Sequence, residues 1–323
     1  MLRKVLVLVL TVIMISAMAI PALAAFEPDK DPALTKYYSF EDTIGDAKLL
    51  GKEATDFGFY DGGTINYTDG VHGKAFYFDG KTGLEIGKDV VKGTNFTIAL
   101  WMNPEAITPW TAAFFARRFE EGDFAQYWLS IAPRTDLDAN PDRKMMFWTC
   151  GQEDYSYWFD GVTTIAPELN KWLHVAVTLS GEDIVVYGDG QIIFDTRTTD
   201  ANYTNNIYAL TDAWTLGGAT FYIGANEFAD AAFQGKIDEV YTFNRALSQS
   251  EIVELMNYNP NPAAPEETPD DTAPEQPAVE TPPAVNNPPA ATTGDISMIF
   301  VVIAVLGAAT VAFTVSKKRK NTI

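Results

Sequence analysis

Short runs in which apolar and polar residues alternate recur between residues 26 and 258. In residues 96–102, with the sequence FTIALWM, the phenylalanine, isoleucine, leucine and methionine occupy alternate positions. Because successive side chains of a strand point to opposite faces of its sheet, this run predicts a strand with one face in a core. Further runs predict strands at residues 36–41, 74–79, 126–132, 144–150, 155–159, 174–180, 183–187, 191–195 and 234–243.

Turn and capping residues separate these runs. Ser180-Gly181-Glu182 lies between two predicted strands, and Asp189-Gly190 is a dipeptide that tight hairpin turns prefer. Ser248 followed by Glu251 is a capping box, which predicts one helix that continues to about residue 257. Many short strands and one closing helix predict an all-β fold, a β-sandwich with one short C-terminal helix.

The two ends of the chain resemble targeting segments rather than parts of a sandwich. Residues 1–24 combine a positive start, an apolar run and an A-x-A cleavage site, which indicate a secretory signal peptide; an uncleaved membrane anchor is the alternative. Residues 296–315 contain no charge and predict a transmembrane helix about 30 Å long. The basic tail at 316–323 would keep that end in the cytoplasm. We therefore expect a single-pass membrane protein whose domain, residues 25–258, is extracellular.

Residues 259–295 have the composition of an extended spacer. They contain ten prolines, seven acidic residues and no base, so they cannot bury enough apolar surface to fold. At about 3.1 Å per residue, this stalk would hold the domain up to roughly 110 Å from the membrane. Thr293-Gly294 resembles the bond that sortases cut in cell-wall sorting signals, but the Leu and Pro of that motif are replaced by Ala290 and Ala291. Retention in the membrane and covalent anchoring to the cell wall by a sortase are the two alternatives for this end of the chain.

Charge and cysteine content exclude several classes of function. The chain has 43 acidic and 23 basic side chains, and residues 26–258 alone are near −19. Such a surface repels phosphate, so we expect no nucleic-acid partner. One cysteine, Cys150, excludes an intramolecular disulfide and a cysteine-based zinc site, and only two histidines are present. A neutral or cationic ligand, or calcium held by oxygen atoms, remains.

Several sequence blocks occur in the order of a known family. They are residues 38–41 (YSFE), 73–80 (GKAFYFDG), 96–104 (FTIALWMNP), 172–176 (WLHVA), 187–190 (YGDG), 223–225 (IGA) and 235–248 (GKIDEVYTFNRALS). Over residues 34–256 they resemble the laminin G-like, concanavalin A-like jelly-roll module of bacterial surface proteins. The resemblance implies two curved antiparallel sheets, frequent carbohydrate binding and often a structural calcium ion.

Carboxylates near the first and last predicted strands are the candidate metal ligands. Asp238 lies within an apolar strand, where an unpaired carboxylate is costly to bury, so it requires a cation or hydrogen-bond donors. The resemblance implies calcium held by Glu41 and Asp238, with backbone carbonyls and Asp46 as further ligands. Residues 53–58 lack the Asn that the family's loop usually carries there. Backbone N–H groups that bind Asp238 without metal are the alternative.

Aromatic residues are dense between residues 108 and 159. Sugars present C–H faces that pack on aromatic rings, while acids and amides bind their hydroxyl groups. We select Trp110, Tyr155, Tyr157 and Trp158 as candidate glycan-binding residues, because their neighbours indicate exposed loops. Packing in the core is the alternative for each of them. The whole group is Trp110, Tyr127, Trp128, Trp148, Tyr155, Tyr157 and Trp158.

A complete catalytic pattern is missing from the sequence. Glycosidases on this fold commonly carry Glu-x-Asp-x-x-Glu, so that paired carboxylates flank one glycosidic bond. Residues 27–29 and 121–123 begin that pattern, but neither continues it. We therefore expect a non-enzymatic cell-surface binding and adhesion module that recognises carbohydrate. A protein-interaction or structural surface module without sugar binding is the alternative, so the expected partner is a glycan or a cell-surface protein.

Overall fold

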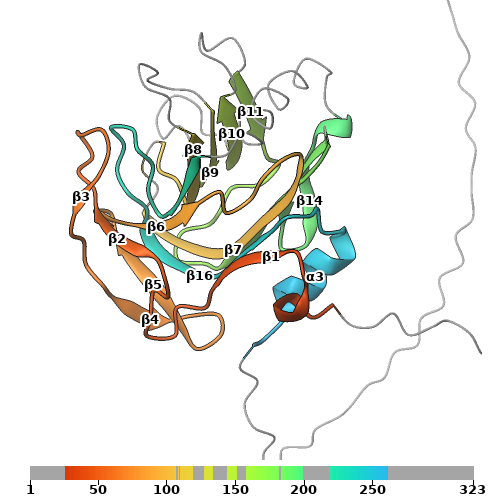
Figure 1. Cartoon of the computed structure of the whole chain (residues 1–323), viewed down its shortest axis with the longest axis horizontal. Helices are drawn as coiled ribbons and strands as arrows, with labels where there is room; N and C mark the ends of the chain where they lie inside the picture. Colours follow the sequence, from red (N-terminus) through yellow and green to blue (C-terminus); the bar gives the residue numbers. More distant parts are fainter. Residues whose placement is uncertain are drawn as a thin grey trace, which may run out of the picture. The chain divides into compact units, whose positions relative to one another are not determined.

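Two antiparallel sheets packed face to face make up the protein (Figure 1). The structure is a computed structural model that describes residues 26–106, 108, 110–118, 127–133, 144–150, 158–181, 183–198 and 218–260. In these ranges the first sheet, sheet A, has the order β14 (Gln191–Asp195), β13 (Asp183–Gly188), β12 (Leu173–Ser180), β7 (Asn95–Ala106), β16 (Gln234–Phe243), β5 (Lys74–Asp79) and β4 (Tyr67–Asp69), and β1 (Leu34–Tyr38) also pairs with β16.

The second sheet, sheet B, has the order β11 (Trp158–Val162), β10 (Met146–Cys150), β9 (Trp128–Ala132), β8 (Phe114–Arg118), β15 (Ala219–Ile223), β6 (Thr82–Lys88), β2 (Lys48–Gly51) and β3 (Tyr60–Asp61). Three short helical segments complete the described chain: η1 (Pro28–Lys30), η2 (Thr196–Thr198) and α3 (Gln249–Asn257). The prediction of a β-sandwich with one short C-terminal helix is confirmed.

The main core lies between the sheets, and it confirms the two-residue period predicted for residues 96–102. Phe96, Ile98, Leu100 and Met102 of β7 all belong to this core and are at most 1% exposed. Burial of one such side chain contributes about 1.5–3 kcal/mol, so the alternation determines which face of β7 points inward.

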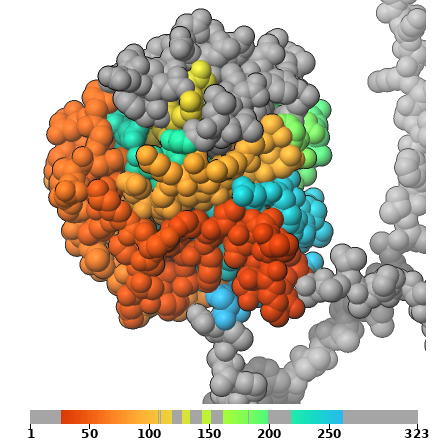
Figure 2. All heavy atoms as spheres, in the orientation of Figure 1, coloured from red at the N-terminus to blue at the C-terminus, as the bar shows by residue number. Residues whose placement is uncertain are grey.

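The outer face of sheet A is covered as well. α3 places Ile252 and Leu255 in a second apolar cluster with Ala99 of β7 and Ala176 of β12, whose small side chains leave room for a helix. The first described residues pack against the same cluster. Figure 2 shows these residues, in red, beside α3, in cyan. The central strands of sheet A are therefore buried on both faces.

A buried threonine connects β7 to the segment that leads into α3. The hydroxyl of Thr97 donates to the carbonyl of Arg245 at 2.8 Å and accepts from the backbone N–H of Leu247 at 2.9 Å. The helix then begins at the predicted capping box. The Ser248 hydroxyl accepts from the N–H of Glu251, and the Glu251 carboxylate accepts from the N–H of Ser248 at 2.7 Å. The capping-box prediction is confirmed.

Some strands differ from the sequence prediction for physical reasons. β1 ends at Tyr38, not at residue 41, because Phe40 and Asp42 have φ values of 54° and 56°, outside the extended region. β8 was not predicted because it begins with two phenylalanines that face opposite sides: Phe114 faces the core and Phe115 the outer cluster. Two identical large residues in succession give no alternation to detect.

The predictions for the chain ends lie almost entirely outside the described residues. This holds for the signal peptide at 1–24, the stalk at 259–295, the transmembrane helix at 296–315 and the tail at 316–323. Within the described ranges, no helix combines the length and the apolar character that crossing a bilayer requires.

We expect Thr97→Val to lower the free energy of unfolding by about 2 kcal/mol, because it leaves a buried carbonyl and a buried N–H without a partner. Urea denaturation of the full chain measures this change. The matched control is Thr178→Val on β12, directly opposite Thr97, whose hydroxyl lies 3.5 Å from the Val185 carbonyl and has no bond to the segment before α3 among the described residues. Equal losses in both variants would contradict the role of Thr97.

Candidate functional site

A group of aromatic side chains lies on the outer face of sheet B, away from the core. Phe115 of β8, Trp128 of β9 and Tyr222 of β15 belong to a separate cluster there and are at most 5% exposed. Their sequence neighbours Phe114 and Leu129 are in the main core, so the strand alternation directs the two sets to opposite faces. We call the whole group the aromatic face: Phe59, Trp110, Phe115, Trp128, Trp148, Tyr222 and Phe228.

Three tryptophans occupy the centre of the aromatic face. The ring of Trp148 on β10 lies 4.6 Å from that of Trp128, nearly perpendicular to it. The ring of Trp110 lies 5.0 Å from Trp148 at an interplanar angle of 39°. Trp128 is buried, whereas Trp110 and Trp148 are half-buried. Trp110 and Trp148 therefore each keep part of their surface accessible.

Hydrogen bonds fix the loop that carries Trp110. Trp110 has a φ of 63°, and its carbonyl accepts from the side-chain amide of Asn226 at 2.9 Å. The same amide donates to Asp230 at 3.1 Å, and its oxygen accepts from the N–H of Phe228 at 2.9 Å. Asn226 is only 3% exposed. One buried side chain thus ties the Trp110 loop to the loop after β15.

The charged groups beneath the aromatic face are paired. Arg117 Nη1 lies 3.0 Å from the carboxylate of Glu227, which also accepts from the Tyr222 hydroxyl at 2.7 Å. The guanidinium lies 5.6 Å from the centre of the Phe228 ring. Burial raises the pKa of nearby Asp230. Because Glu227 neutralises Arg117, this cation offers little net positive charge to a ligand.

Only part of the predicted glycan-binding set can be placed. Trp110 lies on the aromatic face. The backbone of Trp158 pairs with Cys150 at the start of edge strand β11. The side chain of Trp158, and all of Tyr155 and Tyr157, lie outside the described residues. The four residues selected from the sequence did not include Trp148 or Asn226. Trp148 belonged only to the wider group of aromatic residues between residues 108 and 159.

A second notable feature is a pair of buried acids in β16. Asp238 is fully buried, and its carboxylate accepts from the N–H groups of Val71 at 2.8 Å and of Glu239 at 2.9 Å. Glu239 has a φ of 48°, at the point where the register between β16 and β7 shifts. Its Oε2 accepts from the hydroxyls of Tyr37 and Tyr241. Its Oε1 is buried and has no hydrogen-bond partner.

Glu41 reaches the same region from the end of β1, but Asp46 does not. Glu41 accepts from the N–H of Lys74 at 3.0 Å, next to the turn that contacts Asp238. A methyl group at Gly73 would lie 2.1 Å from a Glu41 oxygen, and one at Gly70 would lie 2.4 Å from an Asp238 oxygen. Asp46 instead accepts from the hydroxyl of Tyr38 at 2.6 Å. The structure thus brings together two of the three predicted calcium ligands.

The two acids of β16 disfavour each other's charge. Burial, together with the charge of Glu41, raises the pKa of Asp238 to about 7. Burial and the neighbouring charge of Asp238 raise the pKa of Glu239 to about 8. Among the described residues, no three acidic, histidine or cysteine side chains form a metal-binding group. A cation here would therefore need backbone or water oxygens in addition to carboxylates.

Comparison with known proteins gives one family and several similar folds. A protein-family model described as the concanavalin A-like lectin/glucanases superfamily matches residues 78–253. No curated protein matches the chain.

Among solved structures, domain 4 of AbnA, a GH43 extracellular arabinanase from Geobacillus stearothermophilus, was determined in complex with arabinotriose. It is 27% identical, with a TM-score of 0.52 over 69% of this chain and 98% of that domain. The CBM40 of Ruminococcus gnavus IT-sialidase, bound to alpha2,3 sialyllactose, is 12% identical, with a TM-score of 0.45 over 60% of this chain and 100% of that module. Trypanosoma rangeli sialidase is 18% identical, with a TM-score of 0.41 over 64% of this chain and 32% of the enzyme. The last two show a similar fold alone.

We expect Glu239→Gln to gain stability relative to the wild-type chain as pH rises from about 5 to 8, by about 1 kcal/mol per pH unit. The pKa of Glu239 is raised to about 8 in the folded chain and is about 4.3 in an unfolded one. The stability contributed by its bound proton is therefore complete below about pH 4 and lost as pH rises through 8. Urea denaturation in the presence of a chelator measures the difference.

The stability of the variant is compared with that of the wild-type chain because burial also lowers the pKa of His72 and of His174. These two histidines make both chains more stable as pH rises, which is opposite to the effect of Glu239. Asp61→Asn, at an exposed position, is the control and should follow the wild-type curve. A stability difference between Glu239→Gln and wild type that stays constant with pH would contradict the expectation.

Proposed function

Because the chain belongs to the concanavalin A-like lectin/glucanases superfamily, we propose that it is a carbohydrate-binding module that holds a glycan on the aromatic face of sheet B. The observation that carries the proposal is the pair of half-buried rings, Trp110 and Trp148, fixed 5.0 Å apart in a domain of this family. The arabinanase domain that is 27% identical to this chain was solved with arabinotriose, which supports a saccharide as ligand.

The chemistry of the aromatic face suits a sugar. An aromatic ring offers apolar surface of defined orientation to the C–H face of a pyranose or furanose. Asp230 lies in the loop bonded to the Trp110 loop, and its carboxylate is an acceptor for hydroxyl groups. Saccharide sites in proteins combine an apolar surface with a few fixed polar groups in this way. Since Asn226 fixes the loop before any ligand arrives, little ordering entropy is lost on binding.

The charges favour a neutral saccharide over an acidic one. The buried Arg117 is already paired with Glu227, and residues 26–258 carry a net charge near −19. A sugar carboxylate would approach a negative domain without a free cation on the described part of this face. We therefore choose a neutral oligosaccharide, arabinotriose, as the first ligand to test.

We further propose that the module is not an enzyme. Glu227, a carboxylate beside the aromatic cluster, bonds to Arg117 and to the hydroxyl of Tyr222. A carboxylate used in that way is poorly available as a nucleophile or a general acid for glycoside hydrolysis. Contact with a cell-surface protein is the alternative function, favoured by the exposed Phe57, Tyr60 and Ile65 around β3.

The proposed setting is the outer surface of a cell. The signal-like residues 1–24, the proline-rich acidic residues 259–295 and the apolar residues 296–315 support display on a stalk above the membrane. The basic tail supports an extracellular domain under the positive-inside rule. Cleavage by a sortase between Thr293 and Gly294 would replace the membrane anchor with a link to the cell wall.

We also propose that calcium binds beside the acids of β16. Glu41 and Asp238 would hold the ion together with backbone oxygens of the turn at residues 70–73. The chemistry of the site fits: its donors are oxygen atoms, which calcium prefers, and the buried Glu239 Oε1 has no partner. The raised pKa of Asp238 shows a site that disfavours negative charge when no cation is bound. When bound, the ion would supply that missing positive charge.

We expect Trp110→Ala to weaken the binding of arabinotriose to the full chain by about tenfold, which corresponds to about 1.4 kcal/mol. Isothermal titration calorimetry measures the affinity, and sugar analysis of the same samples detects hydrolysis. The matched control is Trp101→Ala, a half-buried tryptophan on sheet A whose ring packs on His174.

Binding that both variants retain in full would contradict the proposed site and favour the protein-contact alternative. Release of shorter sugars by the wild-type chain would contradict the proposal that the module is not an enzyme.

We expect added calcium to raise the melting temperature of the chelator-treated chain by several degrees, because about 1 kcal/mol corresponds to roughly 2–4 °C in a domain of this size. Asp238→Asn should abolish this increase, while Asp46→Asn should retain it, since Asp46 lies apart from the site. Differential scanning calorimetry measures both variants. A melting temperature that does not change between chelator and calcium would contradict the proposal.

A further inference from the structure

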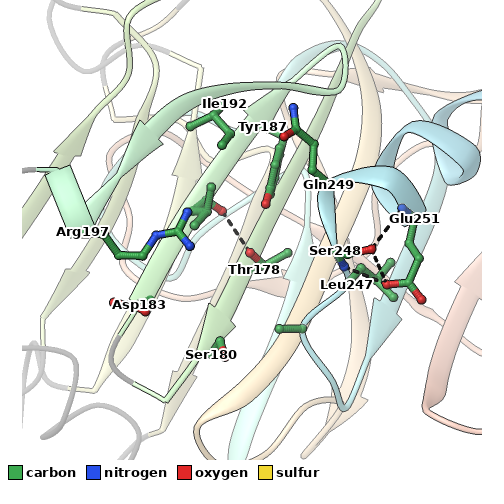
Figure 3. A pocket seen from close by; sticks show the side chains of 12 residues that line it. Thr178, Ser180, Asp183, Tyr187, Ile192, Arg197, Leu247, Ser248, Gln249 and Glu251 are labelled. Atoms are coloured by element: carbon green, nitrogen blue, oxygen red, sulfur yellow. Dashed lines mark hydrogen bonds between the residues drawn. The ribbon is translucent and has the colours of Figure 1, made fainter.

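A pocket of about 470 Å³ lies on the outer face of sheet A, beside the N-terminus of α3 (Figure 3). Its lining comes from β12, β13, β14, η2 and residues 246–251. The pocket occupies the space between the start of α3 and η2, over β12, β13 and β14. The volume is in the range of small-ligand sites, about 300–1,000 Å³.

The floor of the pocket is apolar but contains two neighbouring hydroxyl groups. Val185, Tyr187 and Leu247 line it and are at most 5% exposed, and Ile192 stands at its edge with 43% of its surface exposed. Thr178 is 4% exposed, and its hydroxyl lies 3.5 Å from the Val185 carbonyl, the limit of a hydrogen bond, and interacts with the hydroxyl of Tyr187. These two hydroxyl groups give an apolar floor a polar point to which a ligand hydroxyl can bond.

The charges around the pocket are largely balanced. Arg197 makes two bonds to Asp195, at 2.8 and 2.6 Å, which fix its guanidinium at the wall. Glu251 pairs with Arg245 at 2.6 Å and caps α3. Asp183 is the remaining charged residue of the lining, and its negative charge attracts the guanidinium of Arg197. Two of the three charged lining residues thus have an ion-pair partner, and Asp183 remains as a hydrogen-bond acceptor.

We propose that this pocket is a second saccharide site, which takes a neutral oligosaccharide. Hydroxyl groups of Thr178, Ser180 and Ser248 surround a floor that can hold the apolar face of a sugar. Asp183 accepts and Arg197 donates hydrogen bonds to ligand hydroxyls. The choice of a saccharide rests on the proposed function, but the pocket does not depend on the aromatic face, because the two lie on opposite sides of the sandwich.

Two sites on opposite faces would let one module contact two polysaccharide chains or two parts of one chain. Linked binding events raise the overall affinity for a polymer well above that for a short oligosaccharide. A single-site module shows no such gain. The second site therefore gives the protein a way to cross-link a glycan layer.

The test uses the full chain and three neutral probes, arabinotriose, xylotriose and maltotriose, in isothermal titration calorimetry. Ser180→Trp fills the rim of the pocket from an exposed position. The matched control is Thr55→Trp, at an exposed position that follows β2 of sheet B. Melting temperatures confirm that each variant folds. With the probe that binds, we expect two equivalents for wild type and Thr55→Trp, and one for Ser180→Trp. For Trp110→Ala we expect one equivalent with the wild-type affinity and a second that binds about tenfold more weakly.

The variants separate the two sites. Binding that Ser180→Trp leaves at the wild-type stoichiometry, or binding that Trp110→Ala abolishes completely, would overturn the second site. Binding abolished by Ser180→Trp but unaffected by Trp110→Ala would support the pocket and contradict the aromatic face. Absence of binding to all three probes would overturn the pocket as a neutral saccharide site.

Discussion

The burial of β7 and β16 on both of their faces is the constraint on which the rest of this structure depends. Their inner side chains form the core between the sheets, and α3 and the first described residues cover their outer side. Thr97 joins the two layers through its bonds to the segment before the helix. Sheet A is closed in this way over its centre, and the partly exposed Trp110 and Trp148 lie on the outer face of sheet B.

β16 also explains where the strained backbone and the buried charge lie. The register of β16 against β7 shifts at Asp238 and Glu239, and this places two carboxylates where the fold provides few donors. Tyrosine hydroxyls and backbone N–H groups satisfy most of their oxygens. On the aromatic face, by contrast, the buried Arg117 is paired with the carboxylate of Glu227. We therefore propose a cation for the first region and an uncharged ligand for the second.

Local patterns predicted the fold well, whereas the site depended on contacts between distant segments. The period of residues 96–102 and the Ser248 capping box lie within single elements, so neighbouring residues suffice to detect them. The contact of Trp110 with Trp148 depends on a loop conformation with positive φ and on an amide from residue 226. No sequence pattern close to Trp110 or Trp148 predicts this contact. For the same reason Asp46 was grouped with Glu41 in the sequence, although its side chain bonds to Tyr38 instead.

A crystal structure of the chain grown with arabinotriose is the decisive experiment. We expect a sugar ring packed on Trp110 and Trp148, within hydrogen-bonding distance of the loop that holds Asn226 and Asp230. A saccharide bound elsewhere, with these two rings uncovered, would contradict the assignment of the aromatic face of sheet B as the glycan-binding surface.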